Sequence, residues 1–165
     1  MTSTSTLRHA VADSPVGPLT LVERDGRLGG LYMADQRHLP DPTSFGPRDD
    51  RSLPQAREQL TAYFSGQLQE FDLPLALLGT PFQLQVWDAL RSVPYGDTCT
   101  YGALAAAIGR PAAVRAVGAA NGRNPVCIVL PCHRVVGSTG QLTGYAGGVD
   151  KKAKLLALEK GATLF

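Results

Sequence analysis

The stretch that decides the fold reads NPVCIVLPCHRVV and occupies residues 124–136. Its centre, Val126–Leu130, is a continuous apolar run, which predicts a buried strand. The run leads into Cys132, His133 and Arg134. A thiol is therefore expected beside an imidazole and a guanidinium, which can supply a base and a positive field.

A cysteine beside a histidine is open to more than one interpretation. On a regular strand the side chains of Cys132 and His133 point to opposite faces, so contact between them requires a turn or an intervening water. Buried cysteines also behave as small, inert apolar residues. From these residues alone, a cysteine peptidase, an acyltransferase and an inert buried thiol all remain open.

A sharp helix start lies on the N-terminal side of this stretch. Thr80-Pro81-Phe82-Gln83 is a capping box with proline at the first helical position, and it predicts a helix that ends before Pro94. Farther along, Thr100 can cap a short helix over residues 101–108. A second helix is expected from Pro111 to about Asn121.

The tight connection between these two short helices predicts a helix-turn-helix, a motif found in DNA-binding proteins and in many others. Six small residues leave the second helix with little bulk, and Arg115 is its one long cationic side chain; the six are Ala112, Ala113, Ala116, Gly118, Ala119 and Ala120. Small residues let a helix backbone approach another surface closely. That surface is either the protein itself or a narrow groove in a partner.

The remaining elements are a loop at residues 137–148 and a last helix at 151–160, which Asp150 is expected to cap. On the N-terminal side, alternating residues around two turn signals predict antiparallel strands near 7–13, 18–24 and 27–33. An irregular loop at 34–51, a helix at 53–64 and a further strand at 71–77 are expected to follow.

The charge is divided unevenly along the chain of 165 residues, whose net charge is +2. Residues 1–78 carry 7 Lys and Arg against 10 Asp and Glu, a balance of −3, whereas residues 79–165 carry 9 against 4, a balance of +5. This asymmetry favours a polyanion partner for the C-terminal half, although a solvated basic face explains it equally well.

The cysteine count and the chain start bear on location. Three cysteines, an odd number, and no basic-then-apolar pattern at the start argue for reduced thiols in the cytoplasm. The first six residues are expected to be a frayed tail. No run of residues suits a membrane span, and the scattered histidines predict no metal site.

Residues 79–161 closely resemble the catalytic domain of the O6-alkylguanine-DNA alkyltransferases, or methylated-DNA–protein-cysteine methyltransferases. The residue 124–136 stretch looks like the active-site signature of that family, which is long and specific. Other matching motifs are Tyr101-Gly102, Arg115-Ala116-Val117-Gly118, Gly144-Tyr145-Ala146-Gly147-Gly148 and Leu155-Leu156-Ala157-Leu158-Glu159.

The resemblance implies an α+β fold in two domains. Residues 1–78 would form a small ribonuclease-H-like antiparallel sheet with a helix. Residues 79–165 would form a mostly helical, winged-helix-like domain that carries the helix-turn-helix, binds DNA and performs catalysis.

The activity implied is direct-reversal DNA repair. An alkyl group, typically methyl, would pass from O6-alkylguanine, or from O4-methylthymine, in a flipped-out nucleotide to the protein's own cysteine, in a single irreversible turnover. The expected partner is double-stranded DNA, bound in the minor groove largely independently of sequence by a monomer; cooperative binding along DNA is left open. No cofactor is implied.

The resemblance also assigns roles at the reaction centre. Cys132 would accept the alkyl group, His133 would take the thiol proton through a water, and Glu159 would hold and polarise the imidazole. Asn124 would brace the turn before the active site. Tyr101 would press on the phosphate and donate to the guanine ring.

Further roles concern DNA and the base pocket. Arg115 would fill the stack that the flipped nucleotide leaves, on a helix whose Ala116 and Gly118 permit close approach, and Arg123 is the candidate phosphate contact. Tyr145 and the backbone at Val135 and Ala146 would wall the pocket.

Three other functions compete with this one. A non-catalytic damage-recognition relative replaces the nucleophile, usually by tryptophan, so Cys132 argues against it. A helix-turn-helix regulator needs a recognition helix rich in polar, base-reading side chains, which this helix lacks. A cysteine hydrolase needs an oxyanion loop, for which no signature is visible.

Overall fold

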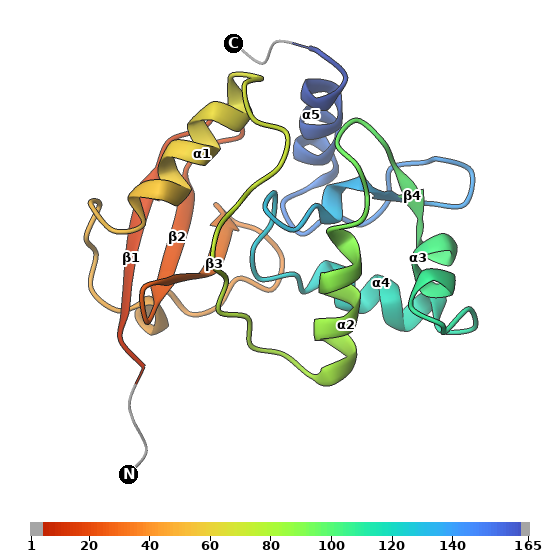
Figure 1. The fold of residues 1–165 in the computed structure, drawn as a ribbon, viewed down its shortest axis with the longest axis horizontal. Coiled ribbons are helices and arrows are strands. Elements are labelled where there is room, and N and C mark those ends of the chain that lie inside the picture. The colour runs from red at the N-terminus through yellow and green to blue at the C-terminus, as the bar shows by residue number, and fades with distance from the viewer. Residues whose placement is uncertain (1–4, 163–165) are drawn as a thin grey trace.

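The structure is a computed structural model that describes residues 5–162. Residues 1–4, part of the expected frayed tail, lie outside that range. Figure 1 shows the sheet with α1 on one side of the molecule and α2, α3 and α4 on the other. The elements are β1 (Leu7–Ala12), β2 (Leu19–Arg24), β3 (Arg27–Met33), η1 (Pro42–Phe45), α1 (Pro54–Phe64), α2 (Pro81–Leu90), β4 (Cys99–Thr100), α3 (Tyr101–Ala107), α4 (Val114–Gly122), η2 (Cys132–Arg134), β5 (Val135–Val136) and α5 (Val149–Glu159).

The three N-terminal strands form an antiparallel sheet in the order β1-β2-β3, as the sequence predicted. Asp25 and Gly26 connect β2 to β3, and both have positive φ, 52° and 81°. Two consecutive left-handed residues make the tight turn that an Asp-Gly pair favours between antiparallel strands. The hairpin therefore follows directly from the turn chemistry.

The prediction of a further strand at residues 71–77 is wrong. Only Leu75 pairs, through an isolated parallel bridge to Leu28. The amide of Leu28 donates to the carbonyl of Pro74, and the amide of Ala76 donates to the carbonyl of Leu28. Pro74 has no N–H with which to extend a ladder, so the segment meets β3 at one bridge without joining the sheet as a strand.

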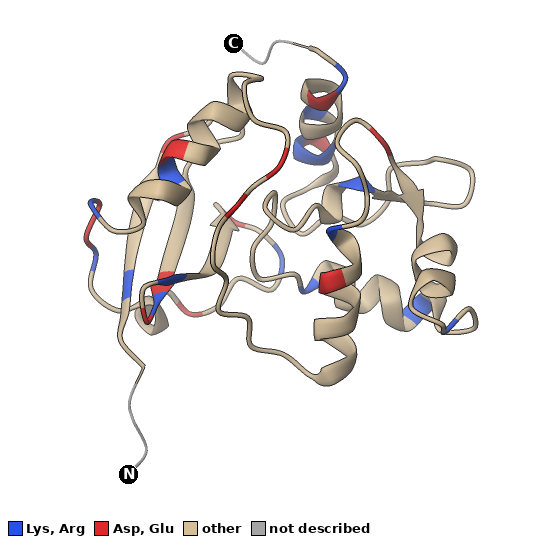
Figure 2. Ribbon diagram, in the orientation of Figure 1, with Lys and Arg blue, Asp and Glu red and all other residues tan. Residues whose placement is uncertain are grey.

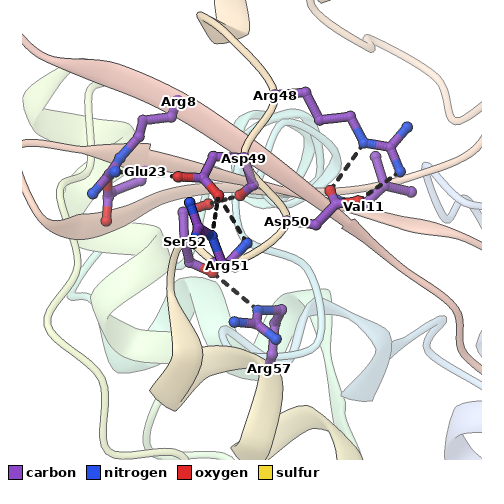
Figure 3. Close-up of polar contacts among 9 residues, drawn as sticks. All are labelled: Arg8, Val11, Glu23, Arg48, Asp49, Asp50, Arg51, Ser52 and Arg57. Atoms are coloured by element: carbon purple, nitrogen blue, oxygen red, sulfur yellow. Dashed lines mark hydrogen bonds and ion pairs between the residues drawn. The ribbon is translucent and has the colours of Figure 1, made fainter.

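Polar contacts fasten the irregular loop before α1 to the sheet, as Figure 3 shows. Arg8 of β1 binds both Glu23 and Asp49, and the amide of Val11 donates to Asp50 over 3.0 Å. The loop contains the 3-10 turn η1. These ion pairs are mostly exposed, so their main effect is to fix the path of the loop.

The helix-turn-helix is formed by α3 and α4. The capping box of α2 is present with both hydrogen bonds, and the indole of Trp87 in α2 donates to the carbonyl of Ala120 in α4 over 2.8 Å. The second helix begins at Val114 and not at Pro111 as expected. The amide of Ala113 donates to the carbonyl of Arg110 over 2.9 Å, so this segment forms a separate turn before the helix.

The prediction of a strand at Val126–Leu130 is also wrong, although the segment is buried as expected. Val126 makes an isolated bridge to Leu31, and the chain then turns back on itself: the amide of Leu130 donates to the carbonyl of Val126 over 3.0 Å. Ile128 adopts a left-handed φ of 73°. The backbone groups are thus bound within the turn, which leaves them unable to pair as a strand.

The last helix begins two residues earlier than expected. Helix α5 starts at Val149, and Gly148 precedes it with a φ of 102°, so Asp150 lies in the first turn and does not cap the helix. Its carboxylate is still favourably placed there, because the helix dipole is positive at that end. No helix among residues 5–162 is long and apolar enough to cross a membrane.

One apolar cluster joins the two parts of the chain. It combines the inner face of the sheet and α1 with residues of α2, α4 and α5. Leu31, Tyr63, Val86, Val126 and Leu155 are all buried to within 1% of complete. The residue 124–136 stretch therefore lies at the centre of the molecule, between the sheet and the helices.

Candidate active site

Cys132 and His133 lie in a single 3-10 turn, η2, and not on a strand. The Cys132 side chain is buried, with 4% of the residue exposed, and His133 is completely buried. The turn resolves the geometric problem that a strand poses, because consecutive side chains in a turn need not point to opposite faces. Strand β5 follows at once and pairs in parallel with β4.

His133 is bound to Glu159 near the end of α5. The two are joined by Nε2 and Oε2 at 2.6 Å, and both side chains are fully buried. The other ring nitrogen, Nδ1, has no hydrogen-bond partner among the described residues. The imidazole is thus oriented through Nε2, while Nδ1 is buried and forms no hydrogen bond within residues 5–162.

Two further side chains bind the same carboxylate. Arg134 donates from Nε to Oε1 of Glu159 over 2.8 Å and from Nη2 to Oε2 over 3.0 Å. Tyr63 of α1 donates from its hydroxyl to Oε2 over 2.6 Å. Glu159 therefore accepts hydrogen bonds from η2 in the C-terminal part and from α1 in the N-terminal part.

These contacts set the ionisation of the pair. Burial acts to raise the pKa of Glu159, but hydrogen bonds from His133 and Arg134 outweigh it and hold that pKa at about 2. Burial lowers the pKa of His133, an effect that its hydrogen bond to Glu159 only partly offsets. At neutral pH the pair is therefore a carboxylate and a neutral imidazole.

The Cys132 thiol is protonated at rest. Burial raises its pKa to about 11, against the opposing influence of the Asn124 side chain and the positive charge of Lys152. At pH 7 such a thiol is ionised in roughly one molecule in ten thousand. A reaction at this sulfur therefore needs a base to remove the proton as the reaction proceeds.

Two asparagines brace the turn around Cys132. Asn124 donates from Nδ2 to the carbonyl of Leu130 over 2.7 Å and accepts at Oδ1 from the amide of Val126 over 3.0 Å. Asn121, at the end of α4, donates to the carbonyl of Cys132 over 3.4 Å. The helix-turn-helix is thus connected to the cysteine by side-chain hydrogen bonds.

The expected pocket wall lies on the loop after β5. Buried Lys152 donates from Nζ to the carbonyl of Val135 over 2.6 Å and to that of Thr143 over 2.9 Å, which ties the middle of the loop to β5. The hydroxyl of Tyr101 donates to the same Thr143 carbonyl over 3.4 Å. Tyr145 is buried, and burial raises its pKa well above 10.

Backbone contacts attach the same loop to the N-terminal part. The amide of Arg37 donates to the carbonyl of Ala146 over 2.7 Å. A Cβ added at Gly147 would lie 2.4 Å from the sulfur of Met33, so a larger residue there would require the Met33 side chain of β3 to move. The described N-terminal residues thus support the expected pocket directly.

The exposed surface of helix α4 is cationic and consists mostly of small side chains. Arg115, Ala116 and Ala119 are exposed, and a Cβ at Gly118 would be 3.8 Å from the ring of Tyr101. Arg123 is exposed just beyond the helix. In Figure 2, α3 and α4 carry no acidic segment. Within residues 5–162, neither Arg115 nor Arg123 forms an ion pair shorter than 4.0 Å.

The structure thus gathers Cys132, His133 and Glu159 in one buried region and places Arg115 and Arg123 on the surface of the helical part. Three contributors escaped the sequence reasoning: Tyr63, Lys152 and Asn121. Tyr63 looked like a core residue of a helix, and nothing in the sequence signals a contact across 96 residues.

Comparison with known proteins agrees with this arrangement. Residues 81–161 match the family model for the DNA binding domain of 6-O-methylguanine DNA methyltransferase, and residues 7–77 match the model for the ribonuclease-like domain of the same enzyme. The chain belongs to the 6-O-methylguanine DNA methyltransferase family.

Individual relatives are similar along nearly the whole chain. A methylated-DNA–protein-cysteine methyltransferase of Mycolicibacterium paratuberculosis is 52% identical over 154 residues, 93% of each chain. One from Methanosarcina acetivorans is 47% identical over 92% of this chain and 97% of its own. The crystal structure of Mycobacterium tuberculosis OGT in complex with DNA superposes with a TM-score of 0.87 at 50% identity, covering 93% and 92% of the two chains.

Proposed function

We propose that this protein repairs alkylated DNA by direct reversal, moving an alkyl group from O6 of a flipped guanine to the sulfur of Cys132. The observation that carries this proposal is the buried cysteine in one turn with a neutral histidine, which is itself held by an ionised glutamate. Relatives about half identical along the chain bear the name of this activity. The protein acts while it is bound to double-stranded DNA, and it needs no cofactor.

The transfer is a displacement at the alkyl carbon. The sulfur lone pair forms the S–C bond as the bond from that carbon to O6 breaks, and the released electron pair restores the C6=O group of guanine. The thiol proton passes to Nδ1 of His133 through a water, and guanine gains a proton at N1. The imidazolium then releases that proton to solvent and guanine takes its N1 proton from solvent, so one proton leaves the protein as one enters the base and the step is balanced.

His133 is suited to this task because its resting form is neutral. Proton transfer from Cys132 creates an imidazolium next to the ionised Glu159, and in a buried site that attraction is much stronger than in water. The thiolate therefore exists mainly when the substrate is in place. This also protects a buried thiol with a pKa of about 11 from side reactions.

Tyr101 and Tyr145 can assist the leaving base. Burial raises the pKa of both hydroxyls, so each remains a hydrogen-bond donor at neutral pH. Donors aimed at a developing anion stabilise the transition state more than the ground state. The resulting thioether has no easy reversal at neutral pH, so each protein molecule acts once.

DNA binds through α4 in the minor groove in this proposal. A guanine O6 inside a duplex is out of reach, so its nucleotide must leave the stack at a cost of a few kcal/mol. Arg115 fills the space that it leaves, and Ala116 and Gly118 let the helix approach the groove. The exposed Arg123 contacts a phosphate. A helix so poor in polar side chains reads little sequence.

We also infer how the chain divides into domains and where the protein acts. The chain divides into domains at residues 78 and 79, which the separate family matches to 7–77 and 81–161 support. The protein acts in the cytoplasm, in keeping with three cysteines, Cys99, Cys127 and Cys132, that are all free thiols.

Stoichiometry tests the proposal. Incubation of the protein with excess duplex that contains O6-methylguanine should restore one guanine per protein molecule and then stop. Cys132→Ser should bind the same duplex and restore none, whereas Cys99→Ser, at a half-buried thiol outside the site, should behave as wild type. Repeated turnover, or restoration by Cys132→Ser, would show that a different chemistry operates.

A further inference from the structure

Tyr63 enters the Glu159 network from the N-terminal part of the chain. It belongs to α1, it is completely buried, and its hydroxyl lies 2.6 Å from Oε2 of Glu159. His133 contacts the same oxygen through Nε2, also at 2.6 Å. A tyrosine hydroxyl and the imidazole therefore share one carboxylate oxygen.

Aromatic neighbours fix the Tyr63 ring. Its centroid lies 5.2 Å from that of Phe64, 5.4 Å from that of Phe71 and 6.3 Å from that of Tyr95. Such packing leaves the hydroxyl little freedom to find another partner. Burial and the neighbouring carboxylate raise the pKa of Tyr63 far above 10, so the group remains a donor across the whole working range.

A donor on the shared oxygen weakens the support that Glu159 gives to a protonated His133. The hydrogen bond from Tyr63 stabilises the carboxylate whether or not the imidazole is charged, and it draws negative charge away from the side that faces the ring. Without this hydrogen bond, Glu159 stabilises the imidazolium form of His133 more strongly. We propose that Tyr63 is a positioning residue for the transfer, whose hydroxyl sets the proton affinity of His133 by competing for the Glu159 oxygen. This inference rests on the proposed function.

Other titratable groups lie near the His133–Glu159 pair. Arg134 on η2 and Lys152 on α5 carry positive charges that lower the pKa of His133. Burial and the nearby Glu159 charge raise the pKa of the Tyr95 hydroxyl, and Cys132 directly precedes His133 in η2. The Cys132 thiol, with a pKa of about 11, stays protonated near neutrality. His133, whose pKa burial lowers from its ordinary value, is therefore the group of this cluster whose protonation is expected to stop the transfer on the acid side.

The pH profile of the transfer tests this role. The single-turnover rate with saturating O6-methylguanine duplex should fall on the acid side as His133 becomes protonated. In Tyr63→Phe this acid limb should move to higher pH by roughly half a unit to one unit, because one hydrogen bond to a charged group has been removed. The matched control is Tyr95→Phe, which loses a hydroxyl from the same aromatic cluster but makes no hydrogen bond to Glu159.

An unmoved acid limb in folded Tyr63→Phe, or an equal movement in Tyr95→Phe, overturns the inference. If Tyr63→Phe does not fold, 3-fluorotyrosine at position 63 keeps the shape and donates more strongly, so the limb should then move to lower pH. An acid limb that does not move with 3-fluorotyrosine at this position also overturns the inference. Failure of the wild-type protein to transfer methyl overturns the proposed function together with this inference, whereas transfer with an unmoved limb overturns the inference alone.

Discussion

Replacement of Glu159 by glutamine should destabilise the protein strongly and in a pH-dependent way. The pKa of Glu159 falls from its ordinary value of 4.5 to about 2 in the folded state. The difference of about 2.5 corresponds to about 3 kcal/mol of unfolding free energy at neutral pH. The side chain is fully buried, so screening by water does not reduce this figure. The loss of charge also leaves the Arg134 guanidinium without its partner, and broken buried pairs cost about 3–5 kcal/mol.

The sign of the pH dependence follows from the direction of the pKa difference. Because the folded protein holds the carboxylate ionised, the contribution of Glu159 is complete above about pH 4.5 and is lost as the pH falls toward 2. Burial lowers the pKa of His133 as well, so protonation of the unfolded chain weakens folding already below about pH 6.5. Glu159→Gln removes the first effect and changes the second.

Urea unfolding of wild type and Glu159→Gln measures both effects. At pH 7 the variant should unfold with a free energy lower by about 3–5 kcal/mol. The difference between the two proteins should shrink as the pH is lowered from 5 toward 3. Gln69→Glu, at an exposed position, should leave the curve unchanged and serves as a control for handling. A loss below about 1 kcal/mol at pH 7, or a difference that stays constant with pH, refutes the reasoning.

Three other predictions concern DNA and the turn. Arg115→Ala should slow repair of a duplex at least tenfold more than reaction with free O6-benzylguanine, since only the duplex requires a nucleotide to be extruded; equal losses on the two substrates contradict this. Arg123→Ala should reduce the slope of log affinity against log salt by about one unit on two unrelated duplexes, and an unchanged slope with a lower melting temperature would place the arginine inside the protein. Asn124→Ala should lower the unfolding free energy by about 2–4 kcal/mol, because two buried hydrogen bonds of 2.7 and 3.0 Å are lost. If thermal unfolding shows a loss smaller than about 0.5 kcal/mol, the turn does not depend on these bonds.

Local signals in the sequence predicted much of the fold. The Asp25-Gly26 pair specifies the hairpin of β2 and β3, and Thr80 with Gln83 specifies the start of α2, because each signal acts within a few residues. The position of the cysteine was also predictable, since the signature around it is long. Cys132, His133 and Glu159 were named together from the resemblance, and the structure brings all three to one buried region.

The errors arose where burial alone does not select a conformation. An apolar run such as Val126–Leu130 suits a strand and a buried turn equally, and the turn wins here because the Asn124 side chain binds backbone groups at both of its ends. Pro111 suits the second position of a turn as well as the first turn of a helix. Tyr63 could not be assigned from the sequence, because its partner Glu159 is brought near it only by the packing of α1 against the C-terminal part.

The central claim is that Cys132 itself accepts the alkyl group, and peptide mass spectrometry tests it most directly. After reaction with duplex that contains O6-methylguanine, a digest should show one added methyl group on the sulfur of Cys132, in step with the guanine restored. Cys127, buried nearby with a pKa raised further by burial and by the Cys132 charge, should remain unmodified, as should Cys99. A methyl group on either of those two residues, or restored guanine with no methylated cysteine, contradicts the claim.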